Sequence, residues 1–188
     1  MTILSLGAIP LYNEDEDRPE ALKAVEAFKV AVADADGLVV ISPEYNHGIS
    51  GVLKNAVDWV SRPGYDSVLK NKPVLVMSSA TSPLGGVRAQ LQLRELFAST
   101  LSRVIARRQI VIGETAQKIK DGELSDAATL TFIDDGIADL IDEIRLLTKA
   151  CDIAPGGSLM RPGRGGSPTP ATNITTVRLI QKRTNPGG

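Results

Sequence analysis

The sequence has 188 residues, of which 43% are apolar, and a formal net charge of −1. This is enough for one globular domain with a full core, and too short for two ordinary domains. No apolar run reaches the length of a membrane span, and the single cysteine, Cys151, excludes an internal disulfide and fits a cytoplasmic protein.

The charge is unevenly distributed, because residues 151–188 carry five Lys or Arg and one acidic residue. The first 150 residues are therefore net acidic, and we expect no nucleic acid as a partner. The first nine residues are apolar, but they lack a basic start and are followed by acidic residues. A signal peptide is not expected.

The first part of the chain predicts a strand end, a loop and a helix. Thr2 to Leu6 suits the end of a strand, and Tyr12 with the acidic residues after it suits a solvated loop. Pro19 then opens a predicted helix. The buried face of this helix is marked by Leu22, Val25, Phe28 and Val32.

The stretch from Ser42 to Trp59 joins a predicted strand, a loop and a helix. Gly37 to Ile41 is an apolar, β-branched run, typical of a strand covered on both faces. A helix follows the loop, with Ser50 as its N-cap. Its buried stripe consists of Leu53, Ala56, Val57 and Val60. The loop, residues 43–49, follows the carboxyl end of a strand, where open α/β sheets bind ligands.

This loop offers an aromatic ring, an amide and a carboxylate, without an adjacent nucleophile and base. Such groups suit the binding of a flat molecule with polar edges. A hydrolase nucleophile elbow and the glycine motifs of nucleotide-binding loops are absent from the sequence. We interpret Glu44 and His47 as an ordinary loop pair, and one histidine provides too few ligands for a metal site.

The second half of the chain repeats the alternation of strand and helix. Pro73 to Ser78 predicts a buried strand, followed by a loop and a helix with Leu91, Leu93, Leu96 and Phe97. Ile105 to Gly113 predicts the last strand. We expect Ser125 to cap the last helix, whose core stripe is Ile133, Ile137, Leu140, Ile141 and Ile144. The alternation predicts a parallel three-layer α/β domain over residues 1–148.

Residues 149–188 differ in composition from the rest of the chain. Gly and Pro make up twelve of the last 38 positions, and the basic residues are scattered among them. Too little apolar surface remains to offset the entropy of ordering, so we expect a disordered tail that binds neither RNA nor a membrane. Ile174 to Ile180 is the only piece of the tail with strand character.

Two segments resemble the NADPH-dependent FMN reductases, a flavodoxin-like family that includes quinone, chromate and azo-dye reductases. The first is P-E-Y-N at Pro43 to Asn46 with G-x-L-K-N-A-x-D-W at Gly51 to Trp59. The second is Ser79 with G-G-x-R-A at Gly85 to Ala89, although Ser82 stands where the family more often has glycine. The resemblance runs from about Ile9 to Leu147 and implies a flavodoxin-like parallel sheet.

The resemblance implies a flavin mechanism. FMN would lie across both loops, with Pro43, Glu44, Tyr45 and Asn46 at the ring system and Ser79, Gly85 and the following turn at its polar edge. Arg88 would contact the flavin or a phosphate of the nicotinamide cofactor, or remain a solvated helix arginine. NADPH would reduce the flavin, which would pass electrons to a quinone, azo compound, metal oxyanion or free flavin. This scheme requires no catalytic side chain and no metal, and family members form homodimers or homotetramers.

The family also begins with a strand and a phosphate-binding loop of the type G-S-x-R-x-x-S-x-N, and the present sequence begins after that unit. The missing strand is central in the flavodoxin-like order 2-1-3-4-5, so we expect an N-terminally incomplete domain. Three explanations are open: the recorded start lies within a longer reading frame, the protein is a truncated relative, or another segment fills the gap. Gly157-Ser158-Leu159 with Arg161 and Ser167 echoes the phosphate loop, but without a strand before it or a helix after it.

An alternative function is that of a flavin-free remnant that acts only by associating with other subunits. The helix at Gly51 to Ser61 is its candidate contact. An exposed Trp59 would favour this alternative, whereas a buried Trp59 would not.

Overall fold

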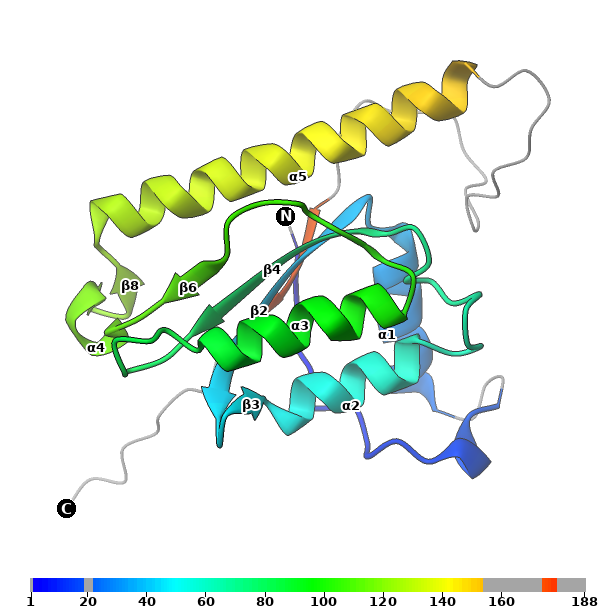
Figure 1. Ribbon diagram of the computed structural model, residues 1–188. Helices are drawn as coiled ribbons and strands as arrows, with labels where there is room; N and C mark the ends of the chain where they lie inside the picture. The colour runs from blue at the N-terminus through cyan, green and yellow to red at the C-terminus, as the bar shows by residue number, and fades with distance from the viewer. Residues whose placement is uncertain (1, 19–21, 154–173, 179–188) are drawn as a thin grey trace.

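The structure is a computed structural model that describes residues 2–18, 22–153 and 174–178. A parallel sheet lies between two helical layers (Figure 1). Its strands follow the order β1 (Thr2–Leu4), β9 (Ile174–Arg178), β2 (Gly37–Tyr45), β4 (Pro73–Ser79) and β5 (Arg103–Val104). Two short strands join this order: β3 (Gly48–Ile49) pairs antiparallel with β2, and β6 (Ile110–Ile112) pairs parallel with β4. The predicted three-layer α/β architecture is confirmed.

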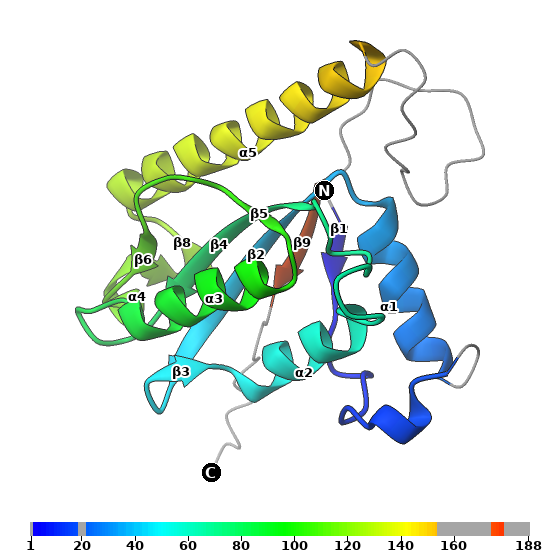
Figure 2. The ribbon, with the colours of Figure 1, turned by 45° about the vertical axis from the view of Figure 1, so that its right-hand side comes forward.

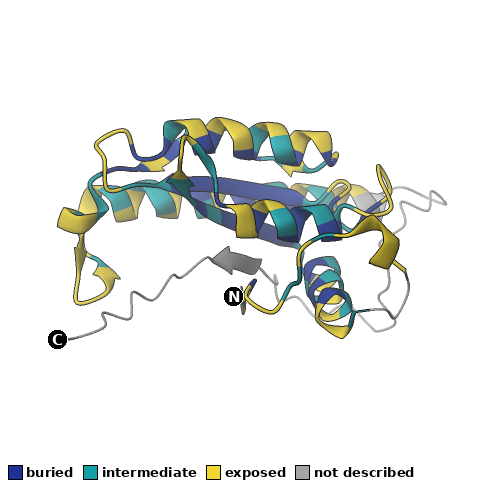
Figure 3. Ribbon diagram, turned by 90° about the horizontal axis from the view of Figure 1, so that it is seen from below, coloured by how far each residue is buried: buried dark blue, intermediate teal, exposed yellow. Residues whose placement is uncertain are grey.

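The two faces of the sheet build two separate cores. Leu38 and Val40 pack with residues of α1 (Lys23–Asp34), α2 (Gly51–Val60) and α3 (Val87–Ser99). Val39 lies in the other core, with Leu140 and Ile144 of α5 (Ala127–Ile153). This division follows from the alternation of side chains along a strand. Figure 3 shows the buried strands between helices whose outer faces are exposed.

The helices of the first layer match the sequence pattern closely. Val25, Phe28 and Val32 are the buried residues of α1, while Pro19 lies outside the described residues. The Ser50 hydroxyl accepts a hydrogen bond from the Leu53 nitrogen, which confirms it as the N-cap of α2. The predicted stripe of α2 is buried, namely Leu53, Ala56, Val57 and Val60. The acidic segment before α1 forms an exposed 3-10 turn, η1 (Glu14–Glu16).

Strand β9 comes from the predicted tail and lies inside the sheet, between β1 and β2 (Figure 2). It is parallel to both neighbours, with Thr176 opposite Ile3 on one side and Val39 on the other. Residues 149–153 continue α5. The tail expected to be disordered thus contains the end of a helix and one strand, β9. The echo of the phosphate loop at residues 157–167 lies outside the described residues.

The predicted strand from Ile105 to Gly113 is shorter than expected, because only β6 forms within it, and β5 lies just before it. Arg107 lies in the break, where its guanidinium forms an ion pair with Asp139 of α5 at 2.6 Å and lies over the Phe132 ring. The break between β5 and β6 thus holds a partly buried arginine that joins the sheet edge to α5.

A short helix, α4 (Thr115–Lys118), and the hairpin of β7 (Ile119–Lys120) and β8 (Glu123–Leu124) lead into α5. The prediction that Ser125 caps this helix is wrong. Asp126 is the cap, because its carboxylate accepts hydrogen bonds from both the nitrogen and the hydroxyl of Thr129. The Ser125 hydroxyl instead donates to the Lys118 carbonyl. Within the described ranges, no helix is long and apolar enough to cross a membrane.

Candidate functional site

The predicted site lies at the carboxyl ends of β2 and β4. Ser42 pairs with Ser78 and Pro43 with Ser79 in the parallel register of the two strands. The two chain segments that follow therefore begin side by side at one edge of the sheet. This is the edge at which open α/β sheets bind ligands.

The first segment is a hairpin and not the open loop expected from the sequence. Strand β2 continues through Pro43 and Glu44 to Tyr45, which pairs with Gly48 of β3. The two turn residues, Asn46 and His47, have φ values of 50° and 66°, as in the two-residue turns that match the twist of a hairpin. Tyr45, Asn46 and His47 are exposed, so the tip of the hairpin presents a ring, an amide and an imidazole.

Glu44 points to the helix that follows the second segment. Its Oε2 atom accepts hydrogen bonds from the backbone nitrogens of Arg88, at 3.0 Å, and Ala89, at 3.1 Å. These are first-turn amides of α3, which have no acceptor within the helix. Glu44, which lies on β2, therefore caps the N-terminus of α3. Its predicted contact with the flavin ring stays a prediction.

The second segment, residues 80–86, is held by close backbone packing. Gly85 and Gly86 both have positive φ. A Cβ atom on Gly85 would lie 2.8 Å from the Gly113 nitrogen, and one on Gly86 would lie 3.2 Å from the Cβ atoms of Glu44 and Ser78. The Ser78 hydroxyl also donates to the Gly85 carbonyl across 3.0 Å. Close packing and positive φ thus explain why glycine occupies both positions, and the sequence alone did not reveal this.

The other residues predicted in this segment lie at its surface. Ser79 is half-buried at the end of β4, and Arg88 is exposed in the first turn of α3. Ser82 is not among the described residues with positive φ, so its backbone conformation does not require glycine. The structure thus brings Pro43 to Asn46, Ser79, Gly85 and Arg88 to one edge of the sheet.

The matched motif on α2, Gly51 to Trp59, has a structural role. The Asn55 side chain accepts a hydrogen bond from the Tyr12 nitrogen and donates one to the Pro10 carbonyl, both at 2.7 Å. The Trp59 indole nitrogen donates to the same carbonyl across 2.9 Å. Asn55 and Trp59 thus bind the segment after β1 to α2. Sequence reasoning missed this, and the only signal was that both residues lie in the matched motif.

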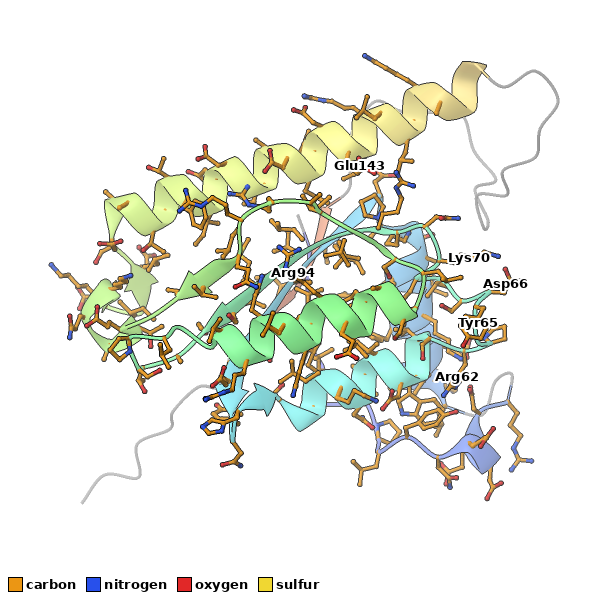
Figure 4. The ribbon with its side chains drawn as sticks, viewed as in Figure 1. Arg62, Tyr65, Asp66, Lys70, Arg94 and Glu143 are labelled. Atoms are coloured by element: carbon orange, nitrogen blue, oxygen red, sulfur yellow. The ribbon has the colours of Figure 1, made fainter. Side chains whose placement is uncertain are left out.

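Tyr12 also contacts α2, so the expectation that it lies in a solvated loop is wrong. Its ring packs edge-on against Trp59, with centroids 4.9 Å apart, and its hydroxyl accepts a hydrogen bond from Arg62. This hydrogen bond raises the pKa of Arg62 above its ordinary value. Figure 4 shows Arg62 just beyond α2, near the segment that follows β1. Trp59 is buried, and this does not favour the subunit-association alternative.

A separate recess of about 570 Å³ lies between β5 and α5. Arg103, which lines it, pairs with Pro73 at the start of β4 and forms an ion pair with Glu143 of α5. The recess therefore lies at the amino-terminal end of β4, away from the predicted site. Over the described residues, no group of three or more His, Cys, Asp or Glu is arranged to hold a metal ion.

Comparison with protein families decides the assignment. Residues 1–117 match the model of the NADPH-dependent FMN reductases. The chain belongs to this family. It is accordingly an oxidoreductase of a family whose cofactors are FMN and NAD(P)H, as the resemblance implied.

Individual relatives agree with this family. The chain is 38% identical over 132 residues to a quinone reductase of Escherichia coli, covering 69% of this chain and 70% of the relative. It is 32% identical to a NADH-dependent flavin reductase subunit 2 of Lactobacillus johnsonii, covering 70% and 73%. A NADPH azoreductase of a Bacillus species is 33% identical, with 66% of each chain covered.

A solved structure supports the fold. FerB, a flavoenzyme NAD(P)H:(acceptor) oxidoreductase of Paracoccus denitrificans, is similar with a TM-score of 0.67 and 27% identity. The similarity covers 74% of this chain and 77% of FerB. The flavodoxin-like class is thus confirmed by family, relatives and structure.

Proposed function

We propose that this chain transfers electrons from NAD(P)H to a small-molecule acceptor, with FMN bound at the carboxyl edge of β2 and β4. The pairing of Pro43 with Ser79 carries this proposal, because it sets both family segments next to each other at that edge. When bound, FMN accepts hydride and releases electrons singly or in pairs. The roles of the chain's own residues are to bind, orient and partly cover it.

The groups at this edge fit a flavin. Tyr45 offers a ring to one side of a flat molecule, and the Asn46 amide can donate to and accept from its polar edge. Ser79 adds a hydroxyl, and Arg88 adds a positive charge suited to a phosphate. The Oε2 atom of the Glu44 carboxylate is engaged by the α3 amides, and the helix N-terminus offsets part of its negative charge.

Gly85 and Gly86 contribute by position and not by a contact of their own. Because both pack closely against neighbouring residues, they hold the segment of residues 80–86 against the ends of the strands. Tight packing of this kind prepares a binding surface in advance. We assign no catalytic side chain, since the cofactor carries the reaction.

The acceptor is proposed by class: a quinone, azo compound, metal oxyanion or free flavin. Tyr45 is 51% exposed, which leaves an aromatic surface for a flat acceptor. The names of the quinone reductase and azoreductase relatives favour the first two classes. Steady-state rates with a quinone and an azo dye, under equal cofactor saturation, would rank them.

Binding at this edge is tested by two substitutions in the same turn. Asn46→Gly removes the candidate amide while glycine keeps the positive φ, and His47→Gly is the matched control. We expect Asn46→Gly to raise the Kd for FMN by about tenfold, roughly the loss of one hydrogen bond. His47→Gly should stay within about twofold. Equal effects of the two substitutions would contradict the assignment of Asn46.

We also propose a homodimer or homotetramer. Leu84, Leu91 and Val52 are apolar and about half exposed or more, which gives surface for a subunit contact. Analytical ultracentrifugation over a range of concentrations tests this, and a monomer at every concentration would contradict it. A cytoplasmic location is proposed on the single cysteine and stays a prediction.

A further inference from the structure

The slot between β1 and β2 is filled by β9, the last of the described strands. β9 pairs through Thr175 to Val177 with Thr2 to Leu4, and through Ile174 to Arg178 with Gly37 to Ile41. Among the described strands, β1 pairs with β9 alone. Without β9, β1 would lose its place in the sheet, and one side of β2 would become an unpaired edge.

The sequence of β9 suits such a central position. Ile174, Thr175, Thr176 and Val177 are all β-branched, and the strand contains neither Gly nor Pro. Gly- and Pro-containing segments flank it on both sides in the sequence. A parallel strand bound between two others gains main-chain hydrogen bonds on both of its edges, as in the recognition of peptides by β-augmentation.

The connection to the rest of the chain favours binding within one molecule. Residues 154–173 join the end of α5 to β9. The entropic cost of bringing two segments of one chain together rises only slowly with the number of residues between them. A tethered segment also competes at an effective concentration in the millimolar range, well above ordinary protein concentrations.

We propose that the slot between β1 and β2 is a strand-binding site, and that its occupant is the chain's own C-terminal strand, bound within the same molecule in the register given above. β9 behaves as a tethered ligand of the domain formed by the described residues up to 153. Its binding completes the sheet. A peptide of the same sequence can therefore replace it when β9 itself is prevented from pairing.

The register and the source of the strand are tested by cross-linking the full-length chain. In a Cys151→Ser background, Ile3→Cys is combined with Thr176→Cys, its register partner, or with Thr175→Cys as control. Adjacent strands lie about 5 Å apart and successive residues face opposite sides, so a short bifunctional thiol reagent should join only the first pair. We expect a cross-link within one chain for that pair. A cross-linked dimer would show a strand from a second copy, and equal reaction of both pairs would show a different register; either result overturns the proposal.

Replacement of the strand is tested with Thr176→Pro in the full-length chain, because proline removes a ladder hydrogen bond from a central strand. We expect hydrogen exchange in β1 and β2 to accelerate at least tenfold, and a synthetic peptide of residues 171–180 to restore protection. The same peptide with proline at position 176 should not. Thr176→Ser, which keeps the backbone N–H, is the control substitution and should leave exchange unchanged. Unaltered protection in Thr176→Pro, or protection that the peptide fails to restore, would overturn the proposal, including in the case where the variant unfolds.

Discussion

The carboxylate of Glu44, near the end of β2, accepts hydrogen bonds from the backbone nitrogens of Arg88 and Ala89 at the start of α3. This contact joins the two segments of the proposed flavin site. It fixes the direction of α3 and places Arg88 beside the hairpin of Asn46. A residue predicted as a cofactor ligand thus acts as a cap supplied by another element.

Glu44→Ala should destabilise the fold by about 1 kcal/mol, since an N-terminal cap and its favourable charge at a helix start are both lost. Urea unfolding measures the difference. Glu95→Ala, on an exposed position of the same helix, is the control and should change stability little. If both variants unfold at the same urea concentration, the capping role is refuted.

Asn55→Ala should be more damaging, because Asn55 makes two hydrogen bonds to the segment after β1. Its loss leaves the Tyr12 nitrogen without that acceptor, and we expect a cost of about 2–3 kcal/mol. Lys54→Ala is the adjacent control. Lys54 forms an exposed i,i+4 pair with Asp58, worth at most about 0.5 kcal/mol. Chemical denaturation measures the free energy of unfolding of both variants. A smaller loss of stability for Asn55→Ala than for Lys54→Ala would contradict the role of Asn55 in holding the segment after β1 against α2.

Gly86→Ala should destabilise by about 1–3 kcal/mol, because Gly86 has φ of 81° and a Cβ atom there meets Glu44 and Ser78. Gly51→Ala is the matched substitution. A Cβ atom at Gly51, the first residue of α2, meets nothing within 4 Å. It should leave stability unchanged or raise it by up to about 1 kcal/mol. Thermal melts of the two variants should therefore move in different directions or by clearly different amounts.

The cap of α5 should depend on pH. Hydrogen bonds from the hydroxyl and the nitrogen of Thr129 lower the pKa of Asp126 below its ordinary value. A lowered pKa in the folded state means that the contribution of Asp126 is fully present above the unfolded value, about 3.9, and is lost as pH falls through the folded value. The difference in melting temperature between the native chain and Asp126→Ala should shrink as pH falls below about 4. A difference that grows on acidification would contradict this sign.

Arg88 should distinguish the two cofactors. If its guanidinium binds a phosphate of the nicotinamide cofactor, Arg88→Gln raises KM for NADPH by about tenfold and leaves the Kd for FMN within about twofold. Arg145→Gln, on α5, is the control, because Arg145 is exposed and pairs with Asp142. A rise in the Kd for FMN without a change in KM would instead place Arg88 at the flavin.

Local sequence patterns predicted most helices and strands, but they did not predict which distant segments pair with each other. The stripe of Leu53, Ala56, Val57 and Val60 fixed α2, and the apolar run after Gly37 fixed β2, because each depends on periodicity within one segment. Strand β9 was not placed, since five β-branched and polar residues in a Gly/Pro-rich tail do not say which edges they join. Ser125 and Asp126 are both good cap residues, so the sequence alone left their choice to geometry.

The site shows the same limit. Register brought Pro43 and Ser79 together as the strand alternation implied. The cap made by Glu44 and the contact of Tyr12 with Trp59 join residues up to 47 positions apart in the chain. No local pattern encodes such contacts.

The most direct test is a titration of the full-length chain with FMN, followed by flavin fluorescence and by protein melting in the same samples. A bound flavin should give saturable quenching with one FMN per chain, and a melting temperature that rises with FMN concentration. Adding NADPH to the saturated protein should then bleach the flavin absorbance. Fluorescence unchanged by the protein, together with a melting temperature unchanged by FMN, would contradict the proposed flavin site and leave the subunit-association alternative.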